Sequence, residues 1–469
     1  MTGALRAVVI GGGLAGITAG LDLADAGVDV TVLEGRPRLG GATSSFRRGT
    51  LPVDTGQHVF LRCCSAYRGL LDRLGVTDRT VLQERLDVPV LVTGEAGTRP
   101  ARLIRGRRSG ALPPPLHLAT ALLGYRALPL RDRLGAVRAA LALGRLDPSD
   151  PEVDAQSFGA WLAAHGQRPA AVQALWRLLT VATLNAEPDD ASLALAATVV
   201  RTGLLESAGG ADIGWSAVPL GELHGTAGAE ALTAAGAQVR TSHRVSALRS
   251  VAGRWSVAVA PARGDGYEID AELVVLATPA DAAAALLPAA AGIDPSGLRA
   301  LGAAPIVNIH VVYDRPVLTE PFVAVVGSPV QWIFDRSAAT GRPRGTYLAL
   351  SQSAADRWVD RPAAELTAEF TAELARLLPA AAQAQVLDAF VTRERAATFR
   401  PAPGQATLRP GAGTLLPGLA VAGAWTDTGW PATMEGAVRS GHAAVAHLLR
   451  SSSSGGARSG PRSSQGVAA

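Results

Sequence analysis

The sequence of 469 residues contains no lysine, so all 44 of its Lys and Arg residues are arginines. Any mechanism that needs a lysine amine, Schiff-base chemistry included, is therefore excluded. Cysteine is almost as scarce, because the chain has only Cys63 and Cys64. Two adjacent cysteines provide neither the spaced pairs of a disulfide framework nor enough ligands for a zinc site. We therefore expect no metal site and a reducing, cytoplasmic setting, with the two thiols packed in the fold rather than acting as a redox pair.

Aromatic residues make up only 4% of the chain, and the net charge is only +4 on 48 kDa. A nucleic-acid-binding protein concentrates positive charge and interleaves it with aromatic side chains, so we expect no nucleic-acid partner. No uncharged apolar run reaches the roughly 18 residues of a membrane-spanning helix, and we expect none. Hydrophobic residues nevertheless make up 48% of the chain, which is enough for a large core. The length allows about three domains, or two large ones.

The N-terminal residues predict a strand, a glycine turn, a helix and a second strand. Residues 7–10 form a short buried-strand pattern, and Gly11, Gly13 and Gly16 follow in the spacing G-x-G-x-x-G. In such a unit the glycines allow a tight turn, close approach to a pyrophosphate and close helix–strand packing. The helix N-terminus then offers free N–H groups to the phosphates. Glu34 ends the second strand about 20 residues further on, where a ribose hydroxyl needs a carboxylate.

A second glycine pair, Gly40 and Gly41, comes soon after Glu34 and distinguishes between the dinucleotides. Such a pair is typical of FAD enzymes, whereas NAD domains normally lack it. We therefore predict FAD as the cofactor.

The C-terminal part of the sequence predicts the other half of the cofactor site. A short strand at residues 419–423 leads to Asp427, and a helix is expected from about Thr433. Asp427 can accept a hydrogen bond from a ribityl hydroxyl or from a phosphate-bound water. The positive end of the helix would point at the N1/O2 edge of the flavin and stabilise its anionic reduced form.

These features place nucleotide-binding segments at both ends and in the middle of the chain. The predicted fold class is α/β: a Rossmann-type FAD-binding domain, glutathione-reductase-like, with an inserted α+β substrate domain. The expected ranges are 1–88, 220–285 and 410–450 for the FAD-binding domain and 89–219 and 286–409 for the substrate domain. Residues 451–469 are rich in Ser, Gly and Arg, and we expect them to be a disordered tail.

The stretch 105–145 is apolar but rich in arginine, and it has two interpretations. Leu130, Leu134 and Leu141 fall at helical spacing, and the arginines lie off that face. Such a helix could lie on an anionic membrane surface, which would make the protein peripheral to the inner face of the cell membrane. Alternatively, it is a solvated helix of the substrate domain.

Taken together, these motifs resemble the flavin-containing amine oxidoreductase/phytoene desaturase superfamily over nearly the whole chain. Residues 54–64 (DTGQHVFLRCC) and 430–437 (WPATMEGA) are similar to squalene-associated FAD-dependent desaturases, the hydroxysqualene dehydroxylases of bacterial hopanoid biosynthesis. The resemblance implies a long isoprenoid substrate and the reductive dehydroxylation of hydroxysqualene to squalene. An external reductant would have to supply reduced flavin, since no second nucleotide fingerprint is visible.

The resemblance also implies roles for individual residues. The adenosine and pyrophosphate would be held by Gly11, Gly13, Gly16, Glu34 and Arg36. The flavin phosphate would pass Gly40 and Gly41, the adenine edge would pair with the backbone of Val245, and Asp427 and Met434 would hold the flavin half. The family usually has Arg directly after the glycine pair, and this chain has Ala42. That departure weakens the expected pyrophosphate contact and leaves Arg36 or Arg38 as substitutes.

Two neighbouring residues are the candidates for catalysis. His58 is the first candidate for the proton donor, because an imidazole of ordinary pKa is partly protonated near neutral pH. Gln57 could orient the substrate hydroxyl.

Three other functions remain open at this point. An oxidative carotenoid or phytoene-type desaturase would differ only in the direction of hydride flow and in substrate shape. A flavin amine oxidase fits less well, because many of those enzymes use a lysine near the flavin. A non-catalytic isoprenoid escort protein would have little need for the phosphate turn.

Overall fold

The computed structural model describes residues 5–95, 97–109 and 112–456. Its first layer is a five-stranded parallel sheet with the order β10-β2-β1-β14-β20. The strands are rich in Val, Leu and Ile, as expected for a parallel sheet covered on both faces. Their bounds are β1 (Arg6–Ile10), β2 (Asp29–Glu34), β10 (Gln238–Thr241), β14 (Leu273–Leu276) and β20 (Leu419–Val421).

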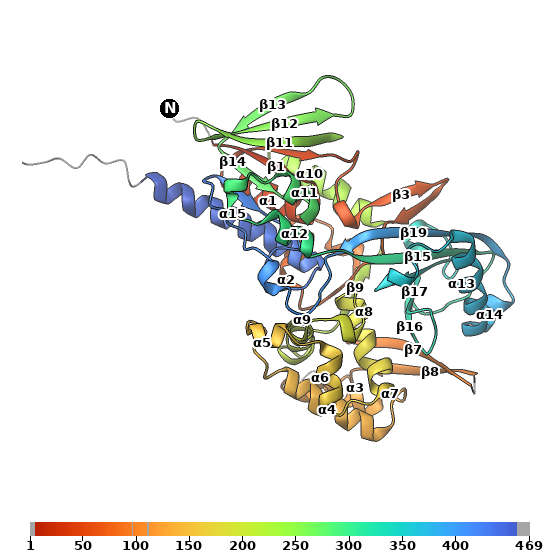
Figure 1. Ribbon diagram of the computed structural model, residues 1–469. Helices are drawn as coiled ribbons and strands as arrows, with labels where there is room; N and C mark the ends of the chain where they lie inside the picture. Colours follow the sequence, from red (N-terminus) through yellow and green to blue (C-terminus); the bar gives the residue numbers. More distant parts are fainter. Residues whose placement is uncertain (1–4, 96, 110–111, 457–469) are drawn as a thin grey trace, which may run out of the picture.

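Helices cover one face of this sheet, and a mixed layer covers the other (Figure 1). On the first face lie α1 (Leu14–Asp25), α2 (Ser65–Arg73), α10 (Ala227–Ala234) and α15 (Met434–Gly456). On the second lie the antiparallel strands β11 (His243–Val251), β12 (Arg254–Pro261) and β13 (Tyr267–Ala271), with α11 (Ala280–Leu286) and α12 (Pro295–Ala300). We call this unit the parallel-sheet domain.

The second layer is a seven-stranded sheet with the order β19-β15-β18-β17-β16-β7-β8. Helices α13 (Ala363–Leu377) and α14 (Pro379–Ala382) pack on one of its faces. The strands are β7 (Asp87–Gly94), β8 (Gly97–Ile104), β15 (Ala304–Tyr313), β16 (Phe322–Val326), β17 (Trp332–Asp335), β18 (Tyr347–Gln352) and β19 (Val386–Thr398).

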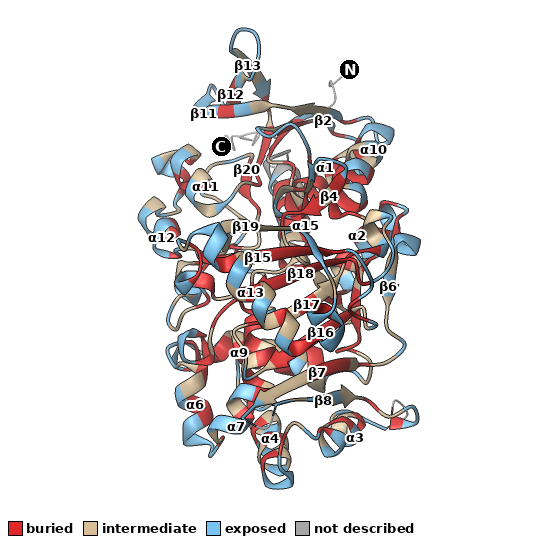
Figure 2. Cartoon of the chain, turned by 90° about the vertical axis from the view of Figure 1, so that its right-hand side faces the viewer, coloured by how far each residue is buried: buried red, intermediate tan, exposed pale blue. Residues whose placement is uncertain are grey.

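Short helices form the end of the molecule farthest from the parallel sheet (Figure 2). They are α3 (Ala119–Gly124), α4 (Leu130–Leu143), α5 (Pro151–Asp154), α6 (Phe158–Ala164), α7 (Pro169–Ala171), α8 (Arg177–Thr183) and α9 (Leu193–Val200). With the seven-stranded sheet they make up the inserted domain. Five further strands join the two domains: β3 (Ser45–Arg48), β4 (Leu51–Asp54), β5 (Val59–Leu61), β6 (Thr80–Leu82) and β9 (Ile213–Ser216).

The predicted fold class is confirmed, and two boundaries differ from expectation. Residues 287–301 were expected in the inserted domain, but Leu287, Leu298 and Leu301 are buried in the core of the parallel-sheet domain. The apolar face of α12 covers that sheet, so burial rather than chain order decides where it belongs. Helix α15 also continues to Gly456, past the expected start of the tail at residue 451. The rest of the expected disordered tail, residues 457–469, lies outside the described residues.

Helix α4 turns three of its four leucines, Leu130, Leu134 and Leu141, toward solvent. Its buried residues include Ala136, Ala139 and Leu143, whereas Leu130 and Leu134 are exposed. Small residues let the helix approach its neighbours closely, so the larger leucines remain on the solvent side. Among the described helices, none is long and apolar enough to cross a bilayer.

A buried ion pair connects the inserted domain with the strands that join the two domains. Arg336, at the end of β17, donates from Nη2 to Asp54 Oδ2 at 2.9 Å, and the two side chains are 9% and 6% exposed. The other oxygen of Asp54 accepts from the Leu220 backbone N–H at 2.9 Å and from Ser45 Oγ at 2.6 Å. Arg336 Nη1 donates to the Ser216 carbonyl at 2.8 Å. The pair therefore joins β3, β4, β9 and β17 at one point.

We predict that Arg336→Met lowers the free energy of unfolding by about 3–5 kcal/mol, because it leaves the Asp54 carboxylate buried without its cation. Urea denaturation measures the loss. The control is Arg395→Met, since Arg395 pairs with Asp360 where both side chains are exposed, and we expect little change there. Equal stability of the two variants would contradict a central role for the buried pair.

Candidate active site

The two glycine motifs pack directly against each other. Gly40 N–H donates to the Gly12 carbonyl at 2.8 Å, and a Cβ on Gly41 would lie 3.0 Å from Gly13 Cα. A Cβ on Gly16 would lie 1.9 Å from the Gly11 carbonyl oxygen. A side chain on Gly41 would push the two turns apart, and one on Gly16 would push helix α1 away from its own turn. These close contacts are the physical reason for both motifs.

Gly13 differs from the other glycines because the space beside it is open. A Cβ there would meet only Gly41 Cα, at 3.9 Å. Gly13 is the N-cap residue of helix α1, and no side chain forms a capping hydrogen bond there. No acidic residue lies in the first turn of the helix. The first N–H groups of α1 are thus available beside an open position, which suits a phosphate group.

Glu34 is fixed by two backbone hydrogen bonds. Its Oε2 accepts from Gly12 N and its Oε1 accepts from Arg36 N, both at 2.7 Å. Each oxygen retains capacity for another donor such as a ribose hydroxyl. Ser242 N–H donates to the Arg36 carbonyl at 2.8 Å, and the register of β11 shifts just after Val245. The structure therefore brings residues 34–36 and the start of β11 together, as an adenosine site requires.

At the C-terminal end, Met434 begins helix α15 and packs against the core, whereas Asp427 lies on an exposed turn. The Asp427 carboxylate accepts from the Gly429 N–H at 3.1 Å. The next residue after Met434 was missed by the sequence analysis. Glu435 is completely buried, and its two oxygens accept from Ala66 N at 3.1 Å and Tyr67 N at 2.7 Å. It therefore caps helix α2 and holds that helix against α15.

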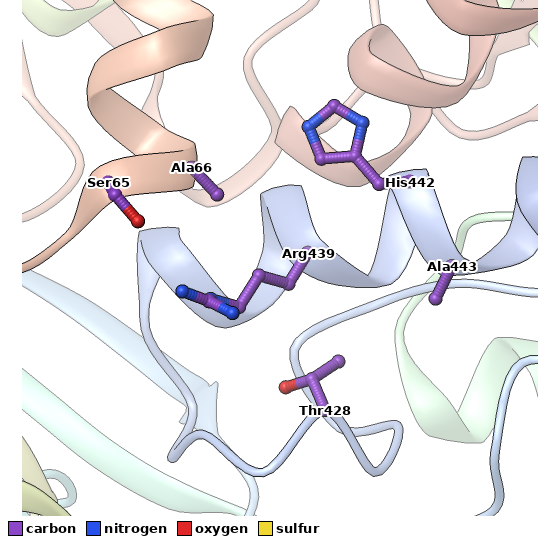
Figure 3. A pocket seen from close by; sticks show the side chains of 6 residues that line it. All are labelled: Ser65, Ala66, Thr428, Arg439, His442 and Ala443. Atoms are coloured by element: carbon purple, nitrogen blue, oxygen red, sulfur yellow. The ribbon is translucent and has the colours of Figure 1, made fainter.

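A pocket of about 500 Å³ opens beside this cap, between α2, α15 and the turn at Thr428 (Figure 3). Arg439 donates to buried Glu435 at 2.7 Å, and His442 lies 2.6 Å from Asp22. The charged groups of the pocket are thus already paired within the fold. No residue predicted for cofactor or substrate lines it, and we assign it no role.

His58 lies between β4 and β5, next to the buried ion pair. Burial is the main cause that lowers its pKa, and the nearby Arg336 acts in the same direction. The carboxylate of Asp54 and a hydrogen bond with the Ala42 backbone partly oppose that shift. The neutral imidazole is therefore favoured more than the sequence suggested. His224 is the neighbouring imidazole: burial and then the charge of His58 lower its pKa to about 3.

Several buried polar atoms have no hydrogen-bond partner within the described residues. Gln57 Nε2, Ser44 Oγ and Thr278 Oγ1 are among them. Ser44 follows the second glycine pair, and Thr278 follows β14, whose end lies beside Gly11. Buried polar atoms are normally paired, so these atoms and the open space at Gly13 fit a bound dinucleotide.

The face of the seven-stranded sheet opposite α13 carries a group of aromatic rings. Phe322 lies with its ring centre 5.6 Å from Trp215 and 6.1 Å from Trp332, and Phe334 continues the group. Aromatics are sparse in the composition, so their gathering here was not visible in the sequence. Phe322 is buried, whereas Trp215, Trp332 and Phe334 are half-buried. Such apolar rings suit a hydrocarbon better than a charged ligand.

Glu394, on β19, is a second residue that the sequence analysis missed. It pairs with Ile306 on the next strand, and burial raises the pKa of its carboxyl, partly opposed by the charge of Arg36. No motif surrounds it, and only the strand register reveals its position. The thiols of Cys63 and Cys64 are free, and Cys64 is buried in the core.

Comparison with known proteins agrees with this geometry. The model of the family described as flavin containing amine oxidoreductase matches residues 14–449. Hydroxysqualene dehydroxylases of Rhodopseudomonas palustris and Sinorhizobium fredii are 32% and 30% identical, over 94% and 93% of this chain and 97% and 96% of theirs. A 15-cis-phytoene desaturase of Capsicum annuum is 25% identical over 93% of this chain and 76% of its own.

Among solved structures, putrescine oxidase bound to putrescine superposes with a TM-score of 0.70. It shares 18% identity and covers 95% of this chain and 99% of its own. At this identity the similarity concerns the fold, and it agrees with a Rossmann-type FAD domain carrying a substrate domain. The chain belongs to the flavin-containing amine oxidoreductase family and is an FAD-dependent oxidoreductase.

Proposed function

We propose that the protein reduces a long isoprenoid alcohol, removing the hydroxyl of hydroxysqualene to give squalene in hopanoid biosynthesis. The observation that carries the proposal is the similarity, at 30–32% identity over almost the full length, to two hydroxysqualene dehydroxylases. The aromatic face of the inserted domain supports it, since an isoprenoid is almost entirely hydrocarbon.

The chain has a candidate residue for each part of FAD. The glycine turns would cradle the pyrophosphate at the N-terminus of α1, and Glu34 would bind the ribose. Val245 would meet the adenine, and Met434 and Asp427 would lie toward the flavin half. Arg36 is exposed beside the turn and would compensate for Ala42. When bound and reduced, FAD supplies the two electrons and the hydrogen that replace the hydroxyl.

The reaction breaks a C–O bond, forms a C–H bond and releases water. It consumes one proton and the equivalent of one hydride, so an external reductant must restore the reduced cofactor. The chain's own task is to hold the C–O carbon in an apolar environment and to deliver the proton to the leaving oxygen. Loss of an allylic hydroxyl leaves a carbocation, and apolar walls protect it from water. His58 is the proposed proton donor and Gln57 would orient the hydroxyl.

We also propose that the protein docks on an anionic membrane surface, from which such an insoluble substrate would enter. Six of the twelve exposed large hydrophobic side chains among the described residues lie in one stretch: Leu112, Leu116, Leu123, Leu130, Leu134 and Leu141. Helices α3 and α4 lie at one end of the molecule (Figure 2). This α3–α4 end therefore exposes leucines and also arginines such as Arg126, Arg131 and Arg138. Apolar side chains and cations on one surface are what an interfacial segment needs.

The first prediction from the proposed function concerns the cofactor. Gly13→Val should fold, because Gly13 has ordinary negative φ and no neighbour within van der Waals contact of a Cβ except Gly41. Its side chain would occupy the proposed phosphate position, so the purified variant should lose its flavin absorbance. Circular dichroism serves as the folding control. A folded variant that retains stoichiometric flavin would show that the phosphates lie elsewhere.

The second prediction concerns the reaction and its proton donor. Anaerobic incubation of the reduced protein with hydroxysqualene should give squalene. If His58 donates the proton, turnover should rise as the pH falls from 8 toward 6, since its lowered pKa makes the protonated form scarce at higher pH. His58→Ala should keep FAD, slow turnover by about 10²–10⁴ and abolish this pH dependence.

Two outcomes of that assay are decisive. If no squalene forms with any reduced preparation of the wild-type protein, the proposed reaction is wrong. If the His58→Ala variant loses less than about threefold, another group is the acid; Glu394→Gln then tests the carboxyl on β19. If Glu394→Gln turns over like wild type while His58→Ala is slow, His58 and not Glu394 is the proton donor.

The third prediction concerns the membrane. Liposomes rich in anionic lipid should bind the protein at low salt, and binding should weaken at higher ionic strength because the charges are screened. Replacing Leu123, Leu130 and Leu134 together by Ser should reduce the bound fraction about tenfold or more. Leu415→Ser is the matched control, since this leucine is 79% exposed but lies outside the α3–α4 end. If the triple variant binds liposomes as well as wild type does, this surface is not the docking surface.

A further inference from the structure

Asn308, on β15, has a side-chain amide without a hydrogen-bond partner among the described residues. The side chain is completely buried, and neither its nitrogen nor its oxygen has a partner within the described residues. The next side chain on the same face behaves in the opposite way: buried His310 uses both ring nitrogens, 2.9 Å from Tyr347 Oη and 3.0 Å from Thr392 Oγ1. A buried amide with both atoms unpartnered is costly, and it calls for an explanation.

The pattern of strand β15 shows which way Asn308 points. Its alternate residues Val307, Ile309 and Val311 are buried in the core beneath α13. Asn308 therefore lies on the opposite face. Val312, on that same face, packs with Val53 of β4. The amide thus faces the side of the sheet that packs against β4, one of the strands that join the two domains.

The neighbours of Asn308 across the sheet change from polar to aromatic. Thr392 on β19 and Ser351 on β18 are its direct partners in register, and Trp332 is the partner of Ser351 on β17. The indole Nε1 of Trp332 is also buried without a partner. Beyond Trp332 come the aromatic rings around Phe322. This cross-strand row therefore starts at the unpartnered amide of Asn308. It continues as an apolar group, which we call the aromatic wall: Trp332 and the rings around Phe322.

We propose that Asn308 binds the hydroxyl of the substrate and positions its C–O bond, while the aromatic wall receives the hydrocarbon chain. This inference rests on the proposed function. An amide can donate to the hydroxyl oxygen and accept from its hydrogen, so it recognises an alcohol in a way that no apolar side chain can. Asn308 is thus a specificity-determining residue: it selects the alcohol over the hydrocarbon product and favours release of the product.

The chain provides a matched control in Gln352. This residue is also completely buried, and both of its amide atoms also lack a partner within the described residues. It pairs in register with Val307, so it lies on the α13 face rather than on the face of Asn308. The two amides share burial and missing partners and differ in the side of the sheet on which they lie.

The experiment compares Asn308→Leu with Gln352→Met. Affinities for hydroxysqualene and for squalene are measured by perturbation of the flavin spectrum, together with KM, kcat, flavin content and Tm. Both variants should bind FAD and be at least as stable as wild type, since an unpartnered amide is replaced by an apolar group of similar size. Asn308→Leu should lose about tenfold of the preference for the alcohol over squalene, the value of one hydrogen bond, with a raised KM. Gln352→Met should retain the preference.

The outcomes separate this inference from the proposed function. If wild-type protein shows no preference for hydroxysqualene and no turnover, the proposed function fails and the role of Asn308 fails with it. If wild type prefers the alcohol and Asn308→Leu does so equally, only the role of Asn308 is refuted. Equal losses in both variants would likewise refute it, because they would indicate a structural effect. Should Asn308→Leu not fold, Asn308→Ala provides the same comparison of alcohol with hydrocarbon.

Discussion

The buried ion pair between Asp54 and Arg336 is the constraint on which the arrangement of this protein depends. Its partners are separated by 282 residues: Asp54 ends β4, which joins the two domains, and Arg336 follows β17 of the inserted domain. Two charges removed from water are stable only when their hydrogen-bonding capacity is filled, and here backbone groups at residues 216 and 220 and Ser45 fill it. The pair therefore permits one relative position of the segments that it joins. Gln57 and His58 lie only three and four residues after Asp54, so the same constraint limits the position of the proposed catalytic residues.

The close packing of the two glycine motifs has a similar consequence at the other end of the site. Backbone meets backbone at Gly12 and Gly40 and at Gly13 and Gly41, which leaves the N-terminus of α1 open beside Glu34. A cofactor bound there would lie against a rigid turn. The C-terminal helix is anchored independently, because the buried carboxylate of Glu435 caps α2. Both halves of the proposed FAD site thus rest on contacts within the protein: the backbone packing of the glycine motifs and the Glu435 cap of α2.

Other parts of the molecule depart from the rules that govern a stable fold. An unpartnered amide on the inner face of the sheet and leucines on the outer face of α4 both cost stability or solubility. His310 shows that the same sheet can satisfy a buried polar side chain fully. Departures of this kind gather where a protein meets a ligand or a surface. Here they lie in the inserted domain, at the proposed position of the substrate hydroxyl and at the proposed docking surface.

The amino-acid sequence alone determined the fold class, the cofactor and the family, because these depend on local patterns: a glycine turn between a strand and a helix, an acid at the end of the next strand, and a second glycine pair. It also located the exposed leucines of α4 on one helical face. The placement of α12, the cap provided by Glu435 and the positions of Asn308 and Glu394 depended on the tertiary structure. Each of these rests on contacts between residues far apart in the chain or on strand register, and no local spacing records which strand lies beside which. The lowered pKa of His58 belongs to the same class, since burial and distant charges produce it.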